Sequence, residues 1–212
     1  ANEEGKGAIP LDFLLRSALR SSPRRIIVGE CRGAEIVVML NAMNTGHPGS
    51  MTTVHADNTK EALVRIENMY LEARPSANIN FIRAQIVSAV DIILQLVRFP
   101  DGTRKVITIS EVERRIEDNS VISLNNIFEF KRDTSDMTKT KGKFEVVSTP
   151  SRTITQMNMF GVDIDTTIFN KEYEMPKSML IDELEKDLPD KMCGWKDEFI
   201  DIFLYQDPQI FH

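Results

Sequence analysis

The segment of residues 25–56 constrains the fold of this chain more than any other. Residues 26–28, Ile-Ile-Val, form a short β-branched run that predicts a fully buried strand. Residues 34–43 then place apolar side chains at helical spacing, and residues 51–54 predict a second strand. Two strands joined by a helix are typical of an α/β fold, so we expect this segment to form part of a sheet wrapped by helices.

An ionisable side chain follows each of these strands. Glu30 comes after the first strand and Gly29, and His55 ends the second. In open α/β sheets, ligands bind at the carboxyl ends of the strands. A carboxylate there can hold Mg²⁺ through water or orient a water for attack on a phosphoryl group. The alternative is that Glu30 simply begins the helix, where free N–H groups favour an anion.

Two histidines allow similar alternatives. His47 lies in the glycine-containing turn of residues 45–50, and His55 follows the second strand. An imidazole can donate to a γ-phosphate and so report whether that phosphate is present. A zinc site with Asp57 has no third histidine or paired cysteine nearby. The remaining interpretation is two loop histidines bonded to backbone groups.

The order of these motifs resembles a known family. IIVGECRG at 26–33, NTGHPGS at 44–50 and TTVHA at 52–56 resemble the Walker B segment and the His box of the ATPases of type II and type IV secretion systems. NEEGKG at 2–7 and LRSALRSSPRR at 15–25 are most similar to the tight-adherence (Flp pilus, CpaF-like) branch. The resemblance is dense over residues 2–112 and thinner to residue 169.

This resemblance implies the later half of a RecA-like P-loop NTPase core. It implies ATP and Mg²⁺ as ligands, with Glu30 as the catalytic carboxylate that also holds Mg²⁺ through water, and His55 as the γ-phosphate sensor. Gly29, Arg32 and His47 are expected at the nucleotide. It further implies a homo-hexamer at the cytoplasmic face of the inner membrane, with membrane platform proteins of a secretion or pilus system as partners.

Composition divides the chain into three parts. We expect the ATPase half-domain at 1–115, a β-hairpin and helix extension at 116–170, and an acidic, amphipathic helical tail at 171–212. The tail holds 5 basic and 11 acidic residues, which accounts for the whole net charge of −6. This balance argues against direct nucleic-acid binding. Two cysteines without a C-x-x-C motif indicate a reducing, cytosolic compartment.

Periodicity predicts the remaining elements. We expect helices at 11–21, 59–73, 80–90 and 149–160, and strands at 92–97, 105–112, 121–130 and 143–147. In the tail, apolar spacing predicts helices at 180–188 and 195–204.

The sequence contains no G-x-x-x-x-G-K-[ST] loop to hold phosphates. Together with the absence of a starting methionine, this predicts a piece of a longer protein that does not hydrolyse ATP by itself. The alternative is a non-catalytic scaffold or subunit-interaction domain of a secretion or conjugation machine, in which the strand before Glu30 is only part of the core.

Overall fold

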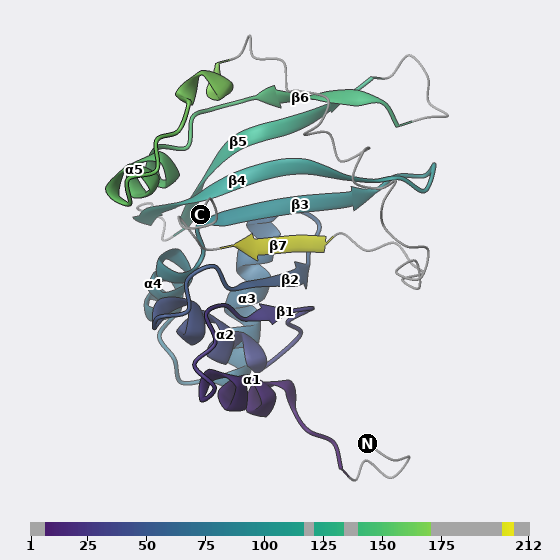
Figure 1. Ribbon diagram of the computed structural model, residues 1–212. Coiled ribbons are helices and arrows are strands. Elements are labelled where there is room, and N and C mark those ends of the chain that lie inside the picture. Colours follow the sequence, from purple (N-terminus) through teal and green to yellow (C-terminus); the bar gives the residue numbers. More distant parts are fainter. Residues whose placement is uncertain (1–6, 117–120, 134–139, 171–200, 206–212) are drawn as a thin grey trace.

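The structure is a computed structural model that describes residues 7–116, 121–133, 140–170 and 201–205. Seven strands of these residues form one sheet in the order β1-β2-β7-β3-β4-β5-β6 (Figure 1). The strands are β1 Ile27–Val28, β2 Met51–His55, β3 Ile92–Arg98, β4 Arg104–Ile116, β5 Ile122–Arg132, β6 Gly142–Val146 and β7 Asp201–Tyr205. The helices are α1 Leu11–Leu19, α2 Glu35–Asn44, α3 Thr59–Ala73, α4 Ile79–Ala89, α5 Ser151–Met159 and the 3₁₀ helix η1 Thr166–Phe169. The predicted α/β fold class is confirmed.

Side-chain caps and backbone conformation set the ends of helices α2, α3 and α4. Asn58 caps α3, its side chain accepting a hydrogen bond from the Glu61 N–H at 2.9 Å. Gly46 follows α2 with a φ of +104°, which ordinary side chains rarely adopt. The apolar stripes of these helices form the core with the first strands. Its fully buried side chains include Ile36, Met39, Leu40, Ile66, Ile82 and Ile86.

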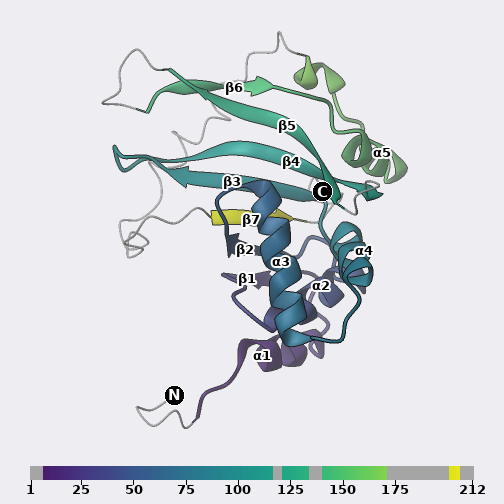
Figure 2. The ribbon, with the colours of Figure 1, turned by 180° about the vertical axis from the view of Figure 1, so that it is seen from behind.

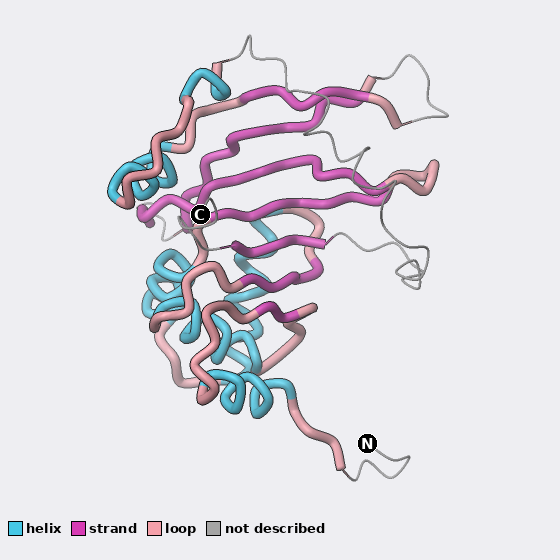
Figure 3. The backbone as a smooth tube through the Cα atoms, viewed as in Figure 1, coloured by secondary structure: helices cyan, strands magenta, loops and turns pink. Residues whose placement is uncertain are grey.

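The tube view separates the molecule into a helix-rich part and a strand-rich part (Figure 3). β1 and β2 pair in parallel, and α1 to α4 gather around them. β3, β4, β5 and β6 form an antiparallel meander, in which β4 reaches Ile116 and therefore crosses the predicted boundary at residue 115. No helix of the described residues is long and apolar enough to cross a membrane.

The predicted burial of the first strand is wrong at its centre. Ile26 and Val28 are buried, but Ile27 is 71% exposed. β1 is the edge strand of the described sheet, and alternate side chains of a strand point to opposite faces. Only the face that meets the helices is therefore covered, and the other face of this short edge strand remains open.

The predicted helix at 195–204 is also wrong where the structure describes it. Residues 201–205 form β7, which pairs antiparallel with β2 on one side and β3 on the other. β2 and β3 run in the same direction and are one strand apart, so β7 fits between them. The backbone N–H and C=O groups on both edges of β7 then pair with these two strands. Ile202, Phe203, Leu204 and Tyr205 suit a strand as well as a helix. The rest of that helix and the helix predicted at 180–188 lie outside the described residues.

A buried cluster of charges holds α5 against the sheet. Arg152 forms an ion pair with Asp91 and donates to the carbonyl oxygens of Val90 and Val112 at 3.3 and 2.6 Å. Glu111, which is fully buried, accepts from the Thr153 N–H at 2.6 Å. Burial raises the pKa of Asp91, while the neighbouring Arg152 opposes this shift. The charges therefore fix the position of α5 without exposure to water.

Candidate functional site

The loop after β1 is held against β2 by two hydrogen bonds. The Cys31 N–H donates to the Thr53 carbonyl oxygen at 3.0 Å, and the Thr53 hydroxyl donates to the Gly29 carbonyl oxygen at 2.7 Å. Glu30 lies between these anchors, so its backbone is fixed next to β2. The space where a Cβ of Gly29 would lie is open, so Gly29 contributes through its carbonyl oxygen.

Glu30 contacts both a histidine and an arginine. Its Oε1 lies 2.6 Å from His55 Nε2, and its Oε2 lies 2.6 Å from Arg32 Nε. The side chains of Glu30 and His55 are only 13% and 18% exposed, whereas that of Arg32 is 71% exposed. The hydrogen bond and the charge of Glu30 raise the pKa of Arg32. The two strand ends thus bring together the two residues that the sequence predicts there.

The alternative interpretation of Glu30 was a carboxylate at the start of the helix, and a neighbouring glutamate has that position instead. Helix α2 begins at Glu35, whose carboxylate accepts hydrogen bonds from the N–H groups of Arg32 and Gly33 at 2.5 and 2.9 Å. Glu35 therefore shapes the loop that carries Arg32, and Glu30 is free of that task. Sequence reasoning did not single out Glu35, although an acidic residue in the first turn of a helix is a common signal.

Cys31 packs beneath the site. It is 1% exposed, and the Thr52 hydroxyl lies 3.3 Å from its sulfur. Burial raises the pKa of the Cys31 thiol to about 12. A thiol with this pKa is almost entirely protonated near neutral pH and is a poor nucleophile. Cys31 therefore supports the loop through packing and its backbone N–H.

His47 lies away from the other predicted site residues. It is in the turn before β2, whereas His55 ends that strand, so the two histidines are at opposite ends of β2. The His47 Nδ1 is 2.7 Å from the Pro23 carbonyl oxygen. This matches the alternative interpretation of His47, a loop histidine that is hydrogen-bonded to a backbone group. The structure does not bring His47 to Glu30.

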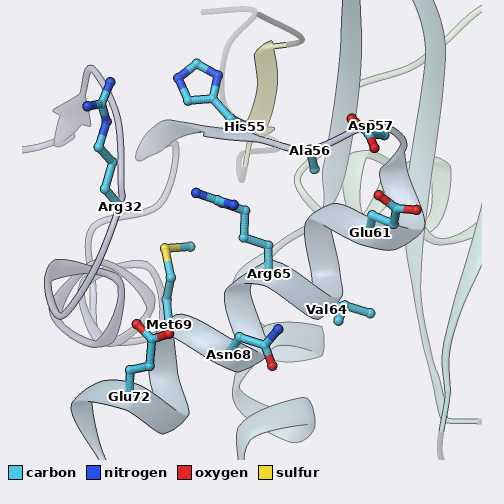
Figure 4. A pocket seen from close by; sticks show the side chains of 10 residues that line it. All are labelled: Arg32, His55, Ala56, Asp57, Glu61, Val64, Arg65, Asn68, Met69 and Glu72. Atoms are coloured by element: carbon cyan, nitrogen blue, oxygen red, sulfur yellow. The ribbon is translucent and has the colours of Figure 1, made fainter.

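A cavity of about 690 Å³ opens beside His55 and α3. Figure 4 shows the side chain of Arg65, from α3, reaching toward the space between Arg32 and His55. The lining combines two cations with carboxylates and a few apolar groups. It consists of Arg32, His55, Ala56, Asp57, Glu61, Val64, Arg65, Asn68, Met69 and Glu72. The volume is in the range of small-molecule sites.

The donor set limits which metal the site can hold. Among the residues that the structure describes, no group of three or more His, Cys, Asp or Glu side chains is arranged to bind a metal ion. Mg²⁺ commonly keeps several waters and takes one or two carboxylates together with substrate phosphates. A single carboxylate such as Glu30 fits that mode, with the phosphates supplying the remaining ligands.

Comparison with known proteins finds a matching family and several relatives. The family described as "Type II/IV secretion system protein" matches residues 2–161. A putative conjugal transfer protein of Mycobacterium tuberculosis is 40% identical over 120 residues, which are 55% of this chain and 34% of that protein. The type IV secretion system protein VirB11 of Bartonella henselae is 34% identical over 105 residues, or 49% of this chain and 29% of that protein.

A solved structure is also similar. It is the crystal structure of the VirB11 ATPase from the Brucella suis type IV secretion system in complex with sulphate, with 31% identity and a TM-score of 0.46 over 49% of this chain and 32% of that chain.

The family match covers more than half of the sequence. The chain therefore belongs to the type II/IV secretion system ATPase family. It spans about a third of the length of the relatives that it matches.

Proposed function

We propose that this chain is the part of a hexameric secretion ATPase that supplies the catalytic carboxylate and the phosphate sensor. The observation that supports this most is the contact of Glu30 with His55 at the carboxyl edges of β1 and β2, with Arg32 on the other carboxylate oxygen. This ATPase would power type II or type IV protein secretion or pilus assembly by ATP hydrolysis. The tight-adherence branch is part of this proposal.

In the proposed reaction, Glu30 orients the attacking water or takes a proton from it. Phosphoryl transfer depends mainly on positioning and on charge stabilisation, so it needs few protein groups besides this carboxylate. Mg²⁺, held by the phosphates and through water by Glu30, would neutralise the developing charge. Arg32 and His55 both contact Glu30, and both carry N–H donors that suit a γ-phosphate. Their transfer from Glu30 to that phosphate would leave the carboxylate available to the water.

The same geometry suggests how hydrolysis is sensed. Loss of the γ-phosphate would return His55 to Glu30 and so change the contact between the ends of β1 and β2. We propose that this change moves one domain relative to another in a homo-hexamer, at the cytoplasmic face of the inner membrane and against membrane platform proteins. The phosphate-binding loop is proposed to come from a part of the protein outside this sequence, so the 212-residue chain alone should be inactive.

The decisive experiment is Glu30→Gln in the full-length protein. Because general base catalysis contributes about 10²–10⁴-fold, we expect kcat for ATP to fall by about 100-fold or more, with the Kd for Mg-ATP nearly unchanged. Glu145→Gln, at an exposed position on β6, is the matched control and should retain turnover. Retained turnover in the Glu30→Gln protein would contradict the role of Glu30.

A second pair of variants tests the sensor. His55→Gln should lower kcat and remove the difference in hydrogen exchange between the ATP-bound and ADP-bound protein, whereas His47→Gln should preserve both. Mg-ATP is then titrated by calorimetry into this chain and into an upstream-extended chain. Binding by the extended chain alone supports the proposal, and tight binding by the short chain contradicts it. Absence of binding by both would favour a non-catalytic scaffold.

A further inference from the structure

A second arginine, Arg65, points into the cavity beside His55. It comes from the second turn of α3, it is exposed, and it lines the cavity together with Arg32 and His55. The side chain of Arg65 is directed toward the space between these two residues (Figure 4). The packing of α3 does not use it, because the helix contributes other side chains, such as Ile66, to the core.

The start of α3 is fixed next to the end of β2. Only residues 56–58 separate the two elements. The buried Gln95 of β3 donates through Nε2 to the Asp57 carbonyl oxygen at 2.6 Å, and Asn58 caps the helix. Seen from behind, α3 lies in front of the strands (Figure 2). The second turn of this helix, which carries Arg65, is therefore held in place relative to the end of β2.

Arg65 does not take the usual partner of an arginine on a helix surface. Glu61 precedes it by four residues, the spacing at which opposite charges pair. Within the described part of the chain, however, the guanidinium of Arg65 forms no ion pair or hydrogen bond. The side chain of Arg65 extends away from Glu61 (Figure 4). Arg65 can therefore meet an anion without first breaking a contact with the described residues.

Arg65 approaches the side of the cavity where Glu30 has its contacts. Arg32 uses Nε for its contact with Glu30, which is one of the five N–H donors of a guanidinium. His55 uses Nε2. An anion between Arg32 and Arg65 requires neither Arg32 nor His55 to leave Glu30, since Arg32 retains its terminal N–H groups.

We propose that Arg65 is a further catalytic residue, which binds the γ-phosphate of ATP in its own subunit. This inference rests on the proposed function, in which Glu30 holds the attacking water. Reacting atoms lie about 3–3.5 Å apart, so the γ-phosphate must lie beside that water. A guanidinium binds phosphate through two parallel N–H groups and keeps its charge at neutral pH. Arg65 would thus stabilise the charge on the γ-phosphoryl oxygens.

The carboxylates of the cavity lie on other parts of its wall. Asp57 and Glu61 are at the start of α3, and Glu72 is near its end. The Arg65 side chain is directed away from both Asp57 and Glu61 (Figure 4). A carboxylate of a neighbouring subunit is another anion that such an arginine can pair with. The carboxyl ends of two strands are the usual ligand site of an α/β fold, which favours a nucleotide phosphate.

Nucleotide affinity in the full-length protein tests the proposal. Glu30→Gln is used as the background to prevent turnover, and calorimetry gives the Kd values of Mg-ATP and Mg-ADP. Arg65→Gln should weaken Mg-ATP binding by about tenfold or more, the effect of one lost charge-assisted hydrogen bond, and leave Mg-ADP within about twofold. Arg74→Gln removes the same charge at an exposed position after α3, outside the cavity, and should change neither Kd by more than about twofold.

Turnover with Glu30 intact provides the second measurement. Arg65→Gln should lower kcat by about 100-fold, because an arginine on the transferred phosphoryl group stabilises the transition state. Arg65→Lys keeps the charge without the two parallel donors and should recover part of both kcat and the affinity for Mg-ATP. Circular dichroism verifies that each variant is folded.

The other outcomes separate this inference from the proposed function. An unchanged Kd of Mg-ATP in the Arg65→Gln protein, or equal weakening of both nucleotides, would overturn the role of Arg65 and leave that of Glu30 intact. Loss of assembly in sedimentation, with an unchanged ratio of the two Kd values, would overturn it in favour of a subunit contact. Failure of the unsubstituted protein to bind Mg-ATP would overturn both proposals.

Discussion

The two ends of the sheet are stabilised in different ways. Around β1 and β2, buried Ile, Leu, Met and Val side chains of α2, α3 and α4 form the core, and the ionisable residues are at the strand ends. Around β4 and α5, the ionisable residues Asp91 and Glu111 are themselves buried, and the side chain of Arg152 is only 10% exposed. The comparison teaches that the charges at the strand ends remain partly accessible to solvent, whereas those of the second region are enclosed and fix a helix.

Removing the cation from the buried cluster should have the largest effect on stability. Arg152→Met leaves the buried carboxylate of Asp91 without its ion-pair partner, and breaking a buried pair in this way costs about 3–5 kcal/mol. Urea unfolding followed by circular dichroism measures the change. Adding Asp91→Asn to Arg152→Met should recover part of it, and additive effects of the two substitutions would contradict the coupling.

A proline in β7 tests whether the two regions depend on each other. Phe203 is opposite Thr53 in β2 and Leu94 in β3, so Phe203→Pro removes a backbone donor in the middle of the sheet and should cost about 3 kcal/mol. We expect unfolding measured by hydrogen exchange to become less cooperative between β2 and β3. Phe211→Pro, outside the described residues, serves as the control for a proline in the tail.

The cap of α3 should contribute less. Asn58→Ala removes the acceptor for the Glu61 N–H and should lower the free energy of unfolding by about 1 kcal/mol. Asn58→Asp keeps the acceptor and should be close to the original protein. Thermal melts of the three proteins distinguish these outcomes, and equal stability of the alanine variant would exclude a capping role.

The smallest effect is expected at the turn between β3 and β4. Asp101 accepts from the Thr103 hydroxyl and N–H, and these bonds, with a further contact from Thr140, hold the pKa of Asp101 well below its usual range. Ionised Asp101 therefore stabilises the fold above the unfolded pKa of about 3.9, and this contribution is lost as pH falls through the lower folded pKa. The difference in stability from Asp101→Asn should be present at pH 7 and shrink toward pH 2.

Part of this molecule follows directly from residue patterns. The helical spacing of residues 59–73 predicts α3 at its observed bounds, and the order of the residues predicts that Glu30 and His55 lie at the carboxyl ends of two strands. These features depend on neighbouring residues in the chain. Glu35 was missed because its contacts are with backbone N–H groups, which every residue type offers.

Long-range pairing explains the remaining differences. Nothing in the spacing of residues 201–205 shows that two parallel strands leave a place for them, so a helix was expected. The ring contacts of Phe130 with Phe99 and Phe144 were missed for a related reason. Phe130 and Phe144 come from β5 and β6 and Phe99 from the turn after β3, so they meet only through strand pairing, which periodicity along one strand does not reveal.

The position of β7 also affects the order in which the sheet can assemble. It is the last of the described strands in the sequence, yet it lies between β2 and β3. During synthesis, β1–β2 and β3–β6 emerge well before the strand that joins them. The edges of β2 and β3 that face each other then remain unpaired until residues 201–205 leave the ribosome. A nascent chain that ends at residue 200 would therefore have two unpaired strand edges, those of β2 and β3. Chaperones that recognise extended segments could bind between them.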